Sequence, residues 1–394
     1  MQVKNLELKN SPLQKVLVII GPTASGKTAL AIRLARKFGG EIVSADSRQV
    51  YRGMDIGTGK TPRDTNAKIK YEKITDARSR TAGYSSRRRN IRPEIGLPSG
   101  LSPPLRSGLA FIPTAERRGI LPEIIKPQPD DQDCGIYVSR GVAHHLIDIA
   151  WPKRQFTVAR FQKLARKAIS GIVRRGKLPI VCGGTGHYID ALIFGQRLPN
   201  VVPNRRLRAR LAKKSVPELY RMLKKFDPRR ASSIDKKNPR RLVRAVEIVL
   251  TTGKPVPPQT AMGKKHAETV YDALWLGLDP SQKKLHRSIR DRLYARMRQG
   301  MIGEVRRLKK QGISSPRLEA LGLEYRYINR YLYGLIRANK RITKKEMCAR
   351  LEREIRRYAK RQMTWFRRNK RIHWIHSQKE TQKLMEKFLR REAV

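Results

Sequence analysis

The residues best suited to chemistry lie in one short segment, GPTASGKT, which follows an apolar run. Its two glycines stand five residues apart, and a lysine and a threonine directly follow the second, which is the spacing of a Walker A loop. In such a loop the backbone N–H groups and the N-terminus of the next helix surround a di- or triphosphate. We therefore predict a diphosphate site made by Gly21, Pro22, Thr23, Ala24, Ser25, Gly26, Lys27 and Thr28.

Two residues of this loop have distinct expected roles. The Lys27 ammonium should reach the phosphate oxygens, and the Thr28 hydroxyl should hold Mg²⁺. A glycine-containing turn that binds nothing is the alternative, but the flanking sequence favours the functional interpretation. Residues 16–20 are apolar, as in a buried parallel strand, and apolar residues recur at helical spacing between Ala31 and Phe38.

Two more polar side chains are expected at the same place, Asp46 and Thr185. Asp46 ends one apolar run, and Thr185 lies in a second glycine-rich turn that follows the run 178–182. Ligands of open parallel sheets collect at the carboxyl ends of strands, so both side chains should face whatever Lys27 holds. Asp46 can act as a base, hold Mg²⁺ through water, or cap the turn that begins at Ser47. The glycines beside Thr185 also fit a tight turn without function.

The surrounding pattern predicts an α/β fold, a parallel P-loop NTPase-like sheet flanked by helices. Expected strands cover residues 16–20, 41–46, 144–149, 178–182, 271–278 and 371–375; the runs 16–20 and 178–182 read as buried strands, and 41–46 is apolar in its middle. Amphipathic helices are expected between them, among them 217–226, 239–252 with Asn238 as N-cap, and one capped by Asp279-Pro280.

Composition shifts divide the chain into five segments. The predicted segments are the first part of the core (1–60), a basic insertion (61–140), the second part of the core (141–195), an inserted basic helical domain that could meet an RNA backbone (196–270), and core completion with basic C-terminal helices (271–394). The insertion is rich in Pro, Gly, Ser and Arg without helical or strand periodicity, so we expect it to be largely disordered. A solvated insert and an RNA-binding arm built on Arg87, Arg88 and Arg89 both remain open.

The charge of the chain is extreme, with 88 Lys and Arg against 32 Asp and Glu, a formal net charge of +56. Charge of this size suggests a polyanionic partner such as RNA, although basicity shared by a whole proteome is the alternative. The three cysteines, Cys134, Cys182 and Cys348, have no metal-ligand spacing, and the N-terminal residues lack a signal-peptide core. We expect a cytoplasmic protein without a membrane span, and a monomer as the working assumption.

Taken together, the motifs resemble the tRNA dimethylallyltransferase family, also called tRNA isopentenyltransferases. The resemblance rests on GPTASGKTALA, SADSRQVYRGMDIGTGK, HHLIDI, PIVCGGTGHYIDAL, NPRRLVRAVEI and YAKRQMTWFRR. It covers most of the chain outside the N-terminal tail and residues 61–140. It implies transfer of the dimethylallyl group from dimethylallyl diphosphate to N6 of the adenosine that is 3′-adjacent to the anticodon of tRNA.

The resemblance also assigns roles to residues. Lys27 and Thr28 would hold the donor diphosphate and Mg²⁺, Asp46 would take the proton of the adenine amine, and Thr185 would lie at the reacting centre. Arg326, in GLEYR where many members read GYR or GYK, would bind diphosphate. The implied contacts to the anticodon stem-loop of tRNA are Asp46, Ser47, Arg48, Gln49, Thr185, Arg208, Arg240, Arg241, Leu242, Val243 and Arg244.

Two rival functions remain at this stage. A P-loop kinase acting on a nucleoside would need a carboxylate at the end of an apolar strand, and the run 178–182 ends in Gly-Gly-Thr instead, although Asp46 could substitute. A non-catalytic RNA-binding protein would leave the convergence of Lys27, Asp46 and Thr185 without a reason. The sequence does not specify which tRNAs are modified.

Overall fold

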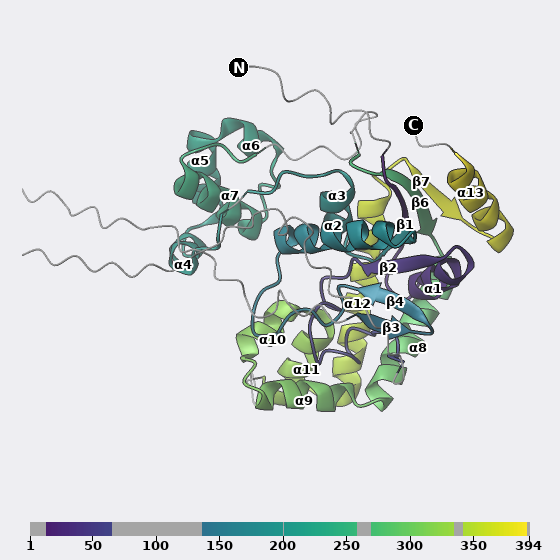
Figure 1. Cartoon of the computed structure of the whole chain (residues 1–394). Helices are drawn as coiled ribbons and strands as arrows, with labels where there is room; N and C mark the ends of the chain where they lie inside the picture. Colours follow the sequence, from purple (N-terminus) through teal and green to yellow (C-terminus); the bar gives the residue numbers. More distant parts are fainter. Residues whose placement is uncertain (1–12, 65–135, 200, 258–268, 335–341, 392–394) are drawn as a thin grey trace, which may run out of the picture. The chain divides into compact units, whose positions relative to one another are not determined.

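The computed structural model describes residues 13–64, 136–199, 201–257, 269–334 and 342–391. Across these residues the strands form one sheet in the order β3-β4-β2-β5-β1-β6-β7, parallel except for β3 (Figure 1). This confirms the predicted parallel α/β fold. The strands are β1 (Lys15–Ile20), β2 (Gly40–Ser44), β3 (Tyr137–Ser139), β4 (Val142–His145), β5 (Leu178–Cys182), β6 (Asp272–Leu278) and β7 (Ile372–Ile375).

The centre of the sheet explains why distant segments meet. β5 lies between β2 and β1, and Cys182 is level with Ser44 on one side and Ile19 on the other. The three strands run in the same direction, so the loops that follow them leave the sheet side by side. Those loops carry the Walker A motif, Asp46 and Thr185.

Helices cover both faces of the sheet because successive strand residues point to opposite sides. Leu17 and Ile19 of β1 pack with residues of α1 (Lys27–Lys37) and α13 (Gln378–Arg390). Val16, Val18 and Ile20 pack on the other side, in a larger core that includes α2 (Val158–Arg174) and α3 (Gly186–Ile193). Residues 16–20 of β1 are all apolar, without alternation, because both faces of the sheet are buried there.

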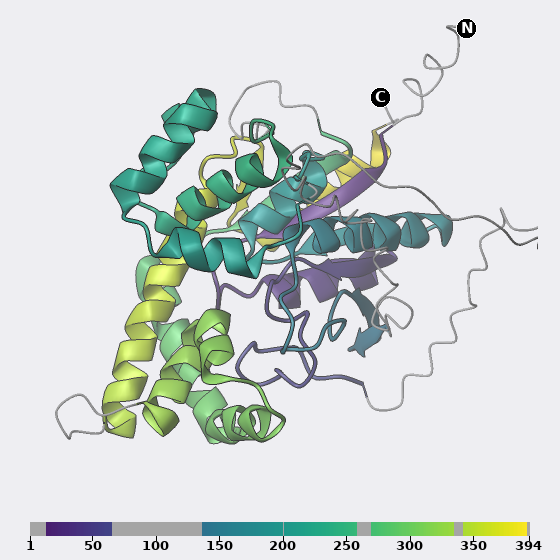
Figure 2. The ribbon, with the colours of Figure 1, turned by 90° about the vertical axis from the view of Figure 1, so that its left-hand side faces the viewer.

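A group of helices extends this larger core. Its members are α8 (Gln282–Arg298), α9 (Met301–Lys310), α10 (Ser315–Leu321), α11 (Leu323–Tyr333) and α12 (Lys344–Phe366). The long α12 packs against α8, α11 and α3, and in Figure 2 it is the extended yellow-green helix beside the green ones. It thereby connects the helical group with the site end of the sheet.

Four helices between α3 and β6 form a separate group around their own apolar core. They are α4 (Arg205–Ala212), α5 (Val216–Phe226), α6 (Pro228–Ser233) and α7 (Pro239–Thr252). The helix predicted over 239–252 has these bounds, and Asn238 caps it by accepting from Arg241 N at 3.2 Å. The helix predicted over 217–226 begins one residue earlier.

Three local expectations were wrong. The strand predicted over 144–149 ends at His145, because Leu146 and Asp148 have left-handed φ angles of 64° and 58°. The N-cap of α8 is Ser281, whose Oγ accepts from Lys284 N at 3.4 Å, instead of Asp279-Pro280. An unpredicted strand, β3, joins β4 through Arg140 and Gly141, both left-handed as a two-residue hairpin turn requires.

Most of the predicted insertion, 65–135, lies outside the described residues. Its two ends belong to the sheet edge instead: Asp64 N donates to Val138 O at 2.9 Å, and the Asp64 carboxylate accepts from Arg140 N and Gly141 N at 2.9 and 2.8 Å. In the part of the chain described by the structure, no helix is long and apolar enough to cross a membrane.

Candidate active site

The Walker A segment forms a loop between β1 and α1. Ala24 and Gly26 have left-handed φ angles of 64° and 91°, and Lys27 Nζ donates to Pro22 O at 2.6 Å. The pKa of Lys27 is lowered to about 8, mainly by burial and slightly by nearby Arg292, while Cys182 and Asp46 oppose the shift. Thr28, in the first turn of α1, is exposed. The loop therefore presents a half-buried lysine and an accessible hydroxyl.

The structure brings Asp46 and Thr185 to this loop. Thr185 Oγ1 accepts from Ser47 N at 3.1 Å, and Thr185 N donates to Ala45 O at 3.2 Å, which ties the segments after β2 and β5 together. Asp46 Oδ1 accepts from Arg48 N and Gln49 N at 2.9 and 3.3 Å. Asp46 therefore caps its turn, one of the three roles considered, while no described residue donates to its Oδ2. One carboxylate oxygen thus remains available for chemistry.

The glycine turn after β5 is glycine-rich because it is crowded. A Cβ atom on Gly183 would lie 2.3 Å from Ala45 O, and one on Gly184 would lie 2.3 Å from Gln362 Nε2. A side chain at either position would push the Thr185 segment away from its neighbours. The glycines thus serve close packing of this segment against the site.

One cationic side chain of the site was not predicted, Arg292 of α8. Burial lowers its pKa to about 10, as does the neighbouring Arg296, while the negative charges of Glu324 and Asp46 oppose the shift. Arg292 therefore lies near both Asp46 and Lys27. The sequence signal was weak, since α8 is rich in arginine and nothing in its pattern distinguishes Arg292, which keeps an exposed surface, from its neighbours.

Glu324 balances part of this positive charge. It is buried, and its two carboxylate oxygens accept from Arg296 Nη1 and Arg48 Nη1, each at 3.1 Å. Arg48, predicted to contact tRNA, also has its guanidinium 5.5 Å from the centre of the Tyr358 ring. The arginine is therefore held at the site by contacts within the protein.

Three residues on one face of helix α12 line the site: Tyr358, Gln362 and Trp365. Burial raises the pKa of Tyr358 to about 12, with Arg48 opposing and Asp46 adding to the shift. The Gln362 amide contacts both glycine loops, and Trp365 Nε1 donates to Asp190 Oδ2 at 2.7 Å. The motif YAKRQMTWFRR had been noted in the sequence, but no role for its side chains was predicted.

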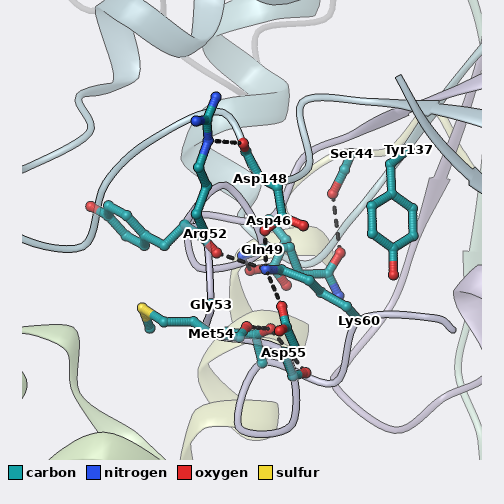
Figure 3. A network of polar contacts seen from close by, with 12 residues as sticks. Ser44, Asp46, Gln49, Arg52, Gly53, Met54, Asp55, Lys60, Tyr137 and Asp148 are labelled. Atoms are coloured by element: carbon teal, nitrogen blue, oxygen red, sulfur yellow. Dashed lines mark hydrogen bonds and ion pairs between the residues drawn. The ribbon is translucent and has the colours of Figure 1, made fainter. Parts of the chain in front are cut away.

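The segment after Asp46 is held by a network around Lys60 (Figure 3). Lys60 Nζ donates to Tyr51 O and Asp55 Oδ1, both at 2.7 Å, and pairs with the Asp148 carboxylate. Gln49, a predicted tRNA contact, accepts from Ser44 Oγ at 3.2 Å. The loop that bears the predicted contact residues 46–49 is thus fixed at both ends.

Arg326 has its described contacts away from the phosphate-binding loop. Its Nε donates to Glu319 O at 3.1 Å and lies 3.7 Å from Glu319 Oε2. Its guanidinium is directed to Glu319 at the end of α10. Its assignment to the diphosphate stays a prediction, and Arg292 is the arginine that the structure places beside Lys27.

The predicted tRNA contacts on α7 divide into two kinds. Arg240 and Arg241 are exposed, whereas the Leu242 side chain is completely buried in the core of α4 to α7 and offers no surface to RNA. Val243 is half-buried. Burial lowers the pKa of His187, and the positive charge of Arg241 adds to the shift. The start of α7 therefore lies near the turn that holds Thr185.

Arg208 and Arg244 share a buried partner, Glu247. Arg208 Nε and Nη2 each donate to the Glu247 carboxylate at 2.8 Å, and Arg244 Nη1 donates to it at 2.6 Å. Burial acts to raise the pKa of Glu247, but these hydrogen bonds outweigh it and hold the pKa below its usual range. Arg208 therefore joins α4 to α7, and Arg244 forms an ion pair within α7, whatever else the two arginines contact.

The site fits a magnesium ion brought in with a phosphate substrate. Among the described residues no three His, Cys, Asp or Glu side chains are grouped to hold a metal. Mg²⁺ commonly needs only one or two protein oxygens, with water and substrate phosphates completing its shell. The exposed Thr28 hydroxyl and the Asp46 carboxylate are oxygens of the required kind.

The fold and site together define a P-loop enzyme of the α/β class with an inserted helical group. Family models described as IPP transferase and isopentenyl transferase match residues 126–369 and 14–81. A tRNA dimethylallyltransferase of Thermomicrobium roseum is 36% identical over 365 residues, covering 91% of this chain and 85% of that protein. One of Carboxydothermus hydrogenoformans is 34% identical, covering 95% and 96%. The chain belongs to the tRNA dimethylallyltransferase family.

Solved structures agree with this assignment. The full-length tRNA isopentenylpyrophosphate transferase of Bacillus halodurans superposes with a TM-score of 0.53 at 30% identity, covering 95% of each chain. A eukaryotic dimethylallyltransferase acting on tRNA has a TM-score of 0.59 at 22% identity, covering 90% of this chain and 70% of that one, and supports the fold. Neither the kinase nor the non-catalytic interpretation is favoured by these relatives.

Proposed function

We propose that this protein transfers the dimethylallyl group from dimethylallyl diphosphate to N6 of the adenosine 3′-adjacent to the anticodon of tRNA, releasing diphosphate. The observation that carries the proposal is that Lys27 and Asp46, which follow strands β1 and β2, lie near Arg292 of α8, in a chain of this family. Cations there suit a leaving diphosphate, and a carboxylate beside them suits a nucleophile that must lose a proton. The tRNA would be met in the cytoplasm.

The donor half of the reaction needs stabilised negative charge. The C1–O bond of an allylic diphosphate breaks with both electrons going to the diphosphate, so cations at its oxygens lower the barrier. Lys27, the N–H groups of the loop and Arg292 are the groups that would bind it. Thr28, with Asp46 through water, would hold Mg²⁺, which supplies further neutralisation of the diphosphate charge when bound.

The acceptor half needs an extruded base and a proton acceptor. N6 of adenine forms the new bond to C1 and loses one proton, which the Asp46 carboxylate would accept through the oxygen that does not cap the turn. The base has to leave the stack of the anticodon loop to reach this depth, which a single-stranded loop permits at low cost. The exposed Arg240 and Arg241 near the Thr185 turn would hold the tRNA backbone.

The test determines which of two substrate pairs the protein uses. The purified protein is incubated with Mg²⁺ and either unmodified tRNA with dimethylallyl diphosphate labelled in the prenyl group, or ATP labelled in the γ-phosphoryl group with candidate nucleosides. We expect label in tRNA from the prenyl donor and no phosphorylated nucleoside. Phosphoryl transfer without prenyl transfer would establish the kinase alternative.

A further inference from the structure

Gln362 makes an unusual pair of contacts with the two glycine loops of the site. It lies on α12, is 6% exposed, and accepts from Thr23 N through Oε1 at 2.8 Å. Its Nε2 donates to Gly184 O at 2.8 Å. One side-chain amide therefore bridges the phosphate-binding loop after β1 and the Thr185 loop after β5, two segments more than 150 residues apart in the sequence.

The two loops have different tasks in the proposed function. The loop of Thr23 carries Lys27 and would bind the donor, and the loop of Gly184 carries Thr185, which is hydrogen-bonded to the segment of Asp46 on the acceptor side. Because the Thr23 N–H is already bonded to Gln362, its contribution is to fix the loop's shape. The amide is thus a direct link between the donor and acceptor halves.

The Gln362 amide also packs closely against the backbone of Gly184. A Cβ atom on Gly184 would lie 2.3 Å from Gln362 Nε2, so the backbone and the amide leave no room for a side chain between them. Both hydrogen-bonding groups of the amide are used, and each would leave a backbone group unpaired if the amide were lost. A small displacement of either loop would break one of the two bonds.

We infer that Gln362 is a positioning residue that holds the phosphate-binding loop and the Thr185 loop in register, so that the donor carbon and the acceptor nitrogen meet at bonding distance. The inference rests on the proposed function and deepens it. Displacements of about 1 Å at a reacting pair slow a reaction by up to about a hundredfold, so loss of the link should act on the chemical step. Binding of tRNA, which depends on exposed cations elsewhere, should be unaffected.

The first test replaces the amide by a side chain of similar length without hydrogen bonds, Gln362→Met. We expect the single-turnover rate of prenyl transfer to fall about 10- to 100-fold, with the Kd for tRNA within threefold of wild type. The matched control is Gln382→Met on α13, where Nε2 bonds only to Glu386 one turn away at 2.8 Å. That variant should keep the wild-type rate.

A second variant separates positioning from simple loss of stability. In Gln362→Glu, a carboxylate accepts from Thr23 N–H but offers nothing to Gly184 O, whereas the protonated acid restores both bonds. Burial raises the pKa of such a carboxyl group, so the ratio of variant to wild-type rate should rise severalfold as the pH falls from about 8 to 6. For a residue that served only to anchor α12, the change in rate would follow the fraction of folded protein at each pH, which thermal melts at both pH values measure.

The outcomes are distinguishable from failure of the proposed function. If the wild-type protein transfers no prenyl group, the proposed function fails. If wild type is active and Gln362→Met retains its single-turnover rate, or loses rate only in proportion to unfolded protein seen in a thermal melt, the positioning role is refuted. A slow, folded Met variant with a pH-rescued Glu variant establishes it.

Discussion

At the scale of single residues, Lys27 shows how burial and function meet. The side chain is half-buried near Asp46, Cys182 and Arg292, and the loss of hydration lowers its pKa to about 8. Although its Nζ donates to Pro22 O, the partial loss of hydration makes the charged form of this amine less favourable than in water. Above about pH 8, where much of the amine is neutral, binding of a diphosphate should be accompanied by uptake of a proton from solvent.

This predicts a pH-dependent affinity for the donor. Below about pH 8 Lys27 is already protonated, so the Kd for dimethylallyl diphosphate should be flat. Above that pH the Kd should rise, by up to about tenfold per unit, because binding must first protonate the amine. Titration calorimetry between pH 7 and 9.5 measures it. Lys27→Arg, always charged, should remove the rise, and a flat wild-type profile would contradict the prediction.

Asp46 combines a structural and a proposed chemical task in one carboxylate. Oδ1 caps the turn at Arg48 and Gln49, and Oδ2 has no described donor. Asp46→Asn keeps the accepting oxygen for the cap and removes the base. We expect the single-turnover rate to fall by about 10² to 10⁴ with a thermal midpoint close to wild type. A near-normal rate would leave Asp46 with its capping role alone.

At the scale of elements, the sequence was most informative where local pattern decides structure. An apolar run predicts the strand before the Walker A loop, and the glycines predict the loop itself. Asn238 predicts the N-terminus of α7. The sequence was least informative where distant segments meet. Gln362 bonds to Thr23 and Gly184, and no local pattern in α12 indicates either partner.

The same distinction applies to the arginines of α7 and α4. The apolar residues of α7, spaced as in an amphipathic helix, indicate its buried face, but they do not reveal Glu247 as a shared partner of Arg244 and Arg208. A buried carboxylate on a helix is visible in the sequence only as one acidic residue among apolar ones. Its partner on α4 is fixed by packing.

This division predicts which arginines of α7 bind RNA. Arg240→Gln with Arg241→Gln removes two exposed charges near the Thr185 turn without touching the Glu247 pairs. If both meet phosphates, the slope of log affinity for tRNA against log salt should fall by about 1.4 to 1.8. Filter binding over a range of salt measures it, with donor affinity unchanged.

The control removes the same number of charges far along the chain. Lys383→Gln with Lys387→Gln alters two exposed lysines of α13, on the helix that packs against β6 and β7. We expect nearly the wild-type slope in that variant. Equal slopes for the two double variants would mean that the net charge of +56 acts as a general attraction and that α7 is no specific docking element.

At the scale of the whole molecule, the residues of the candidate active site lie outside 65–135. The chain enters and leaves that stretch at one place on the sheet edge, where Thr61 Oγ1 and Ser139 Oγ lie 2.8 Å apart. A variant with a short Gly/Ser linker in place of 65–135 should therefore fold and transfer prenyl groups at a rate within about threefold of wild type, since loop length has a weak effect on closure entropy. Circular dichroism and the transfer assay check this, and an unfolded product would show that the stretch is part of the core.

The account as a whole depends on where the prenyl group goes. The most direct measurement uses unmodified tRNA and its matched transcript with guanosine in place of the adenosine 3′-adjacent to the anticodon. Each is incubated with labelled dimethylallyl diphosphate and Mg²⁺, digested to nucleosides and analysed by mass spectrometry. We predict one labelled nucleoside, N6-(dimethylallyl)adenosine, from the first tRNA and none from the second. Label on another nucleoside, or equal label in both transcripts, would contradict the proposed reaction at this site.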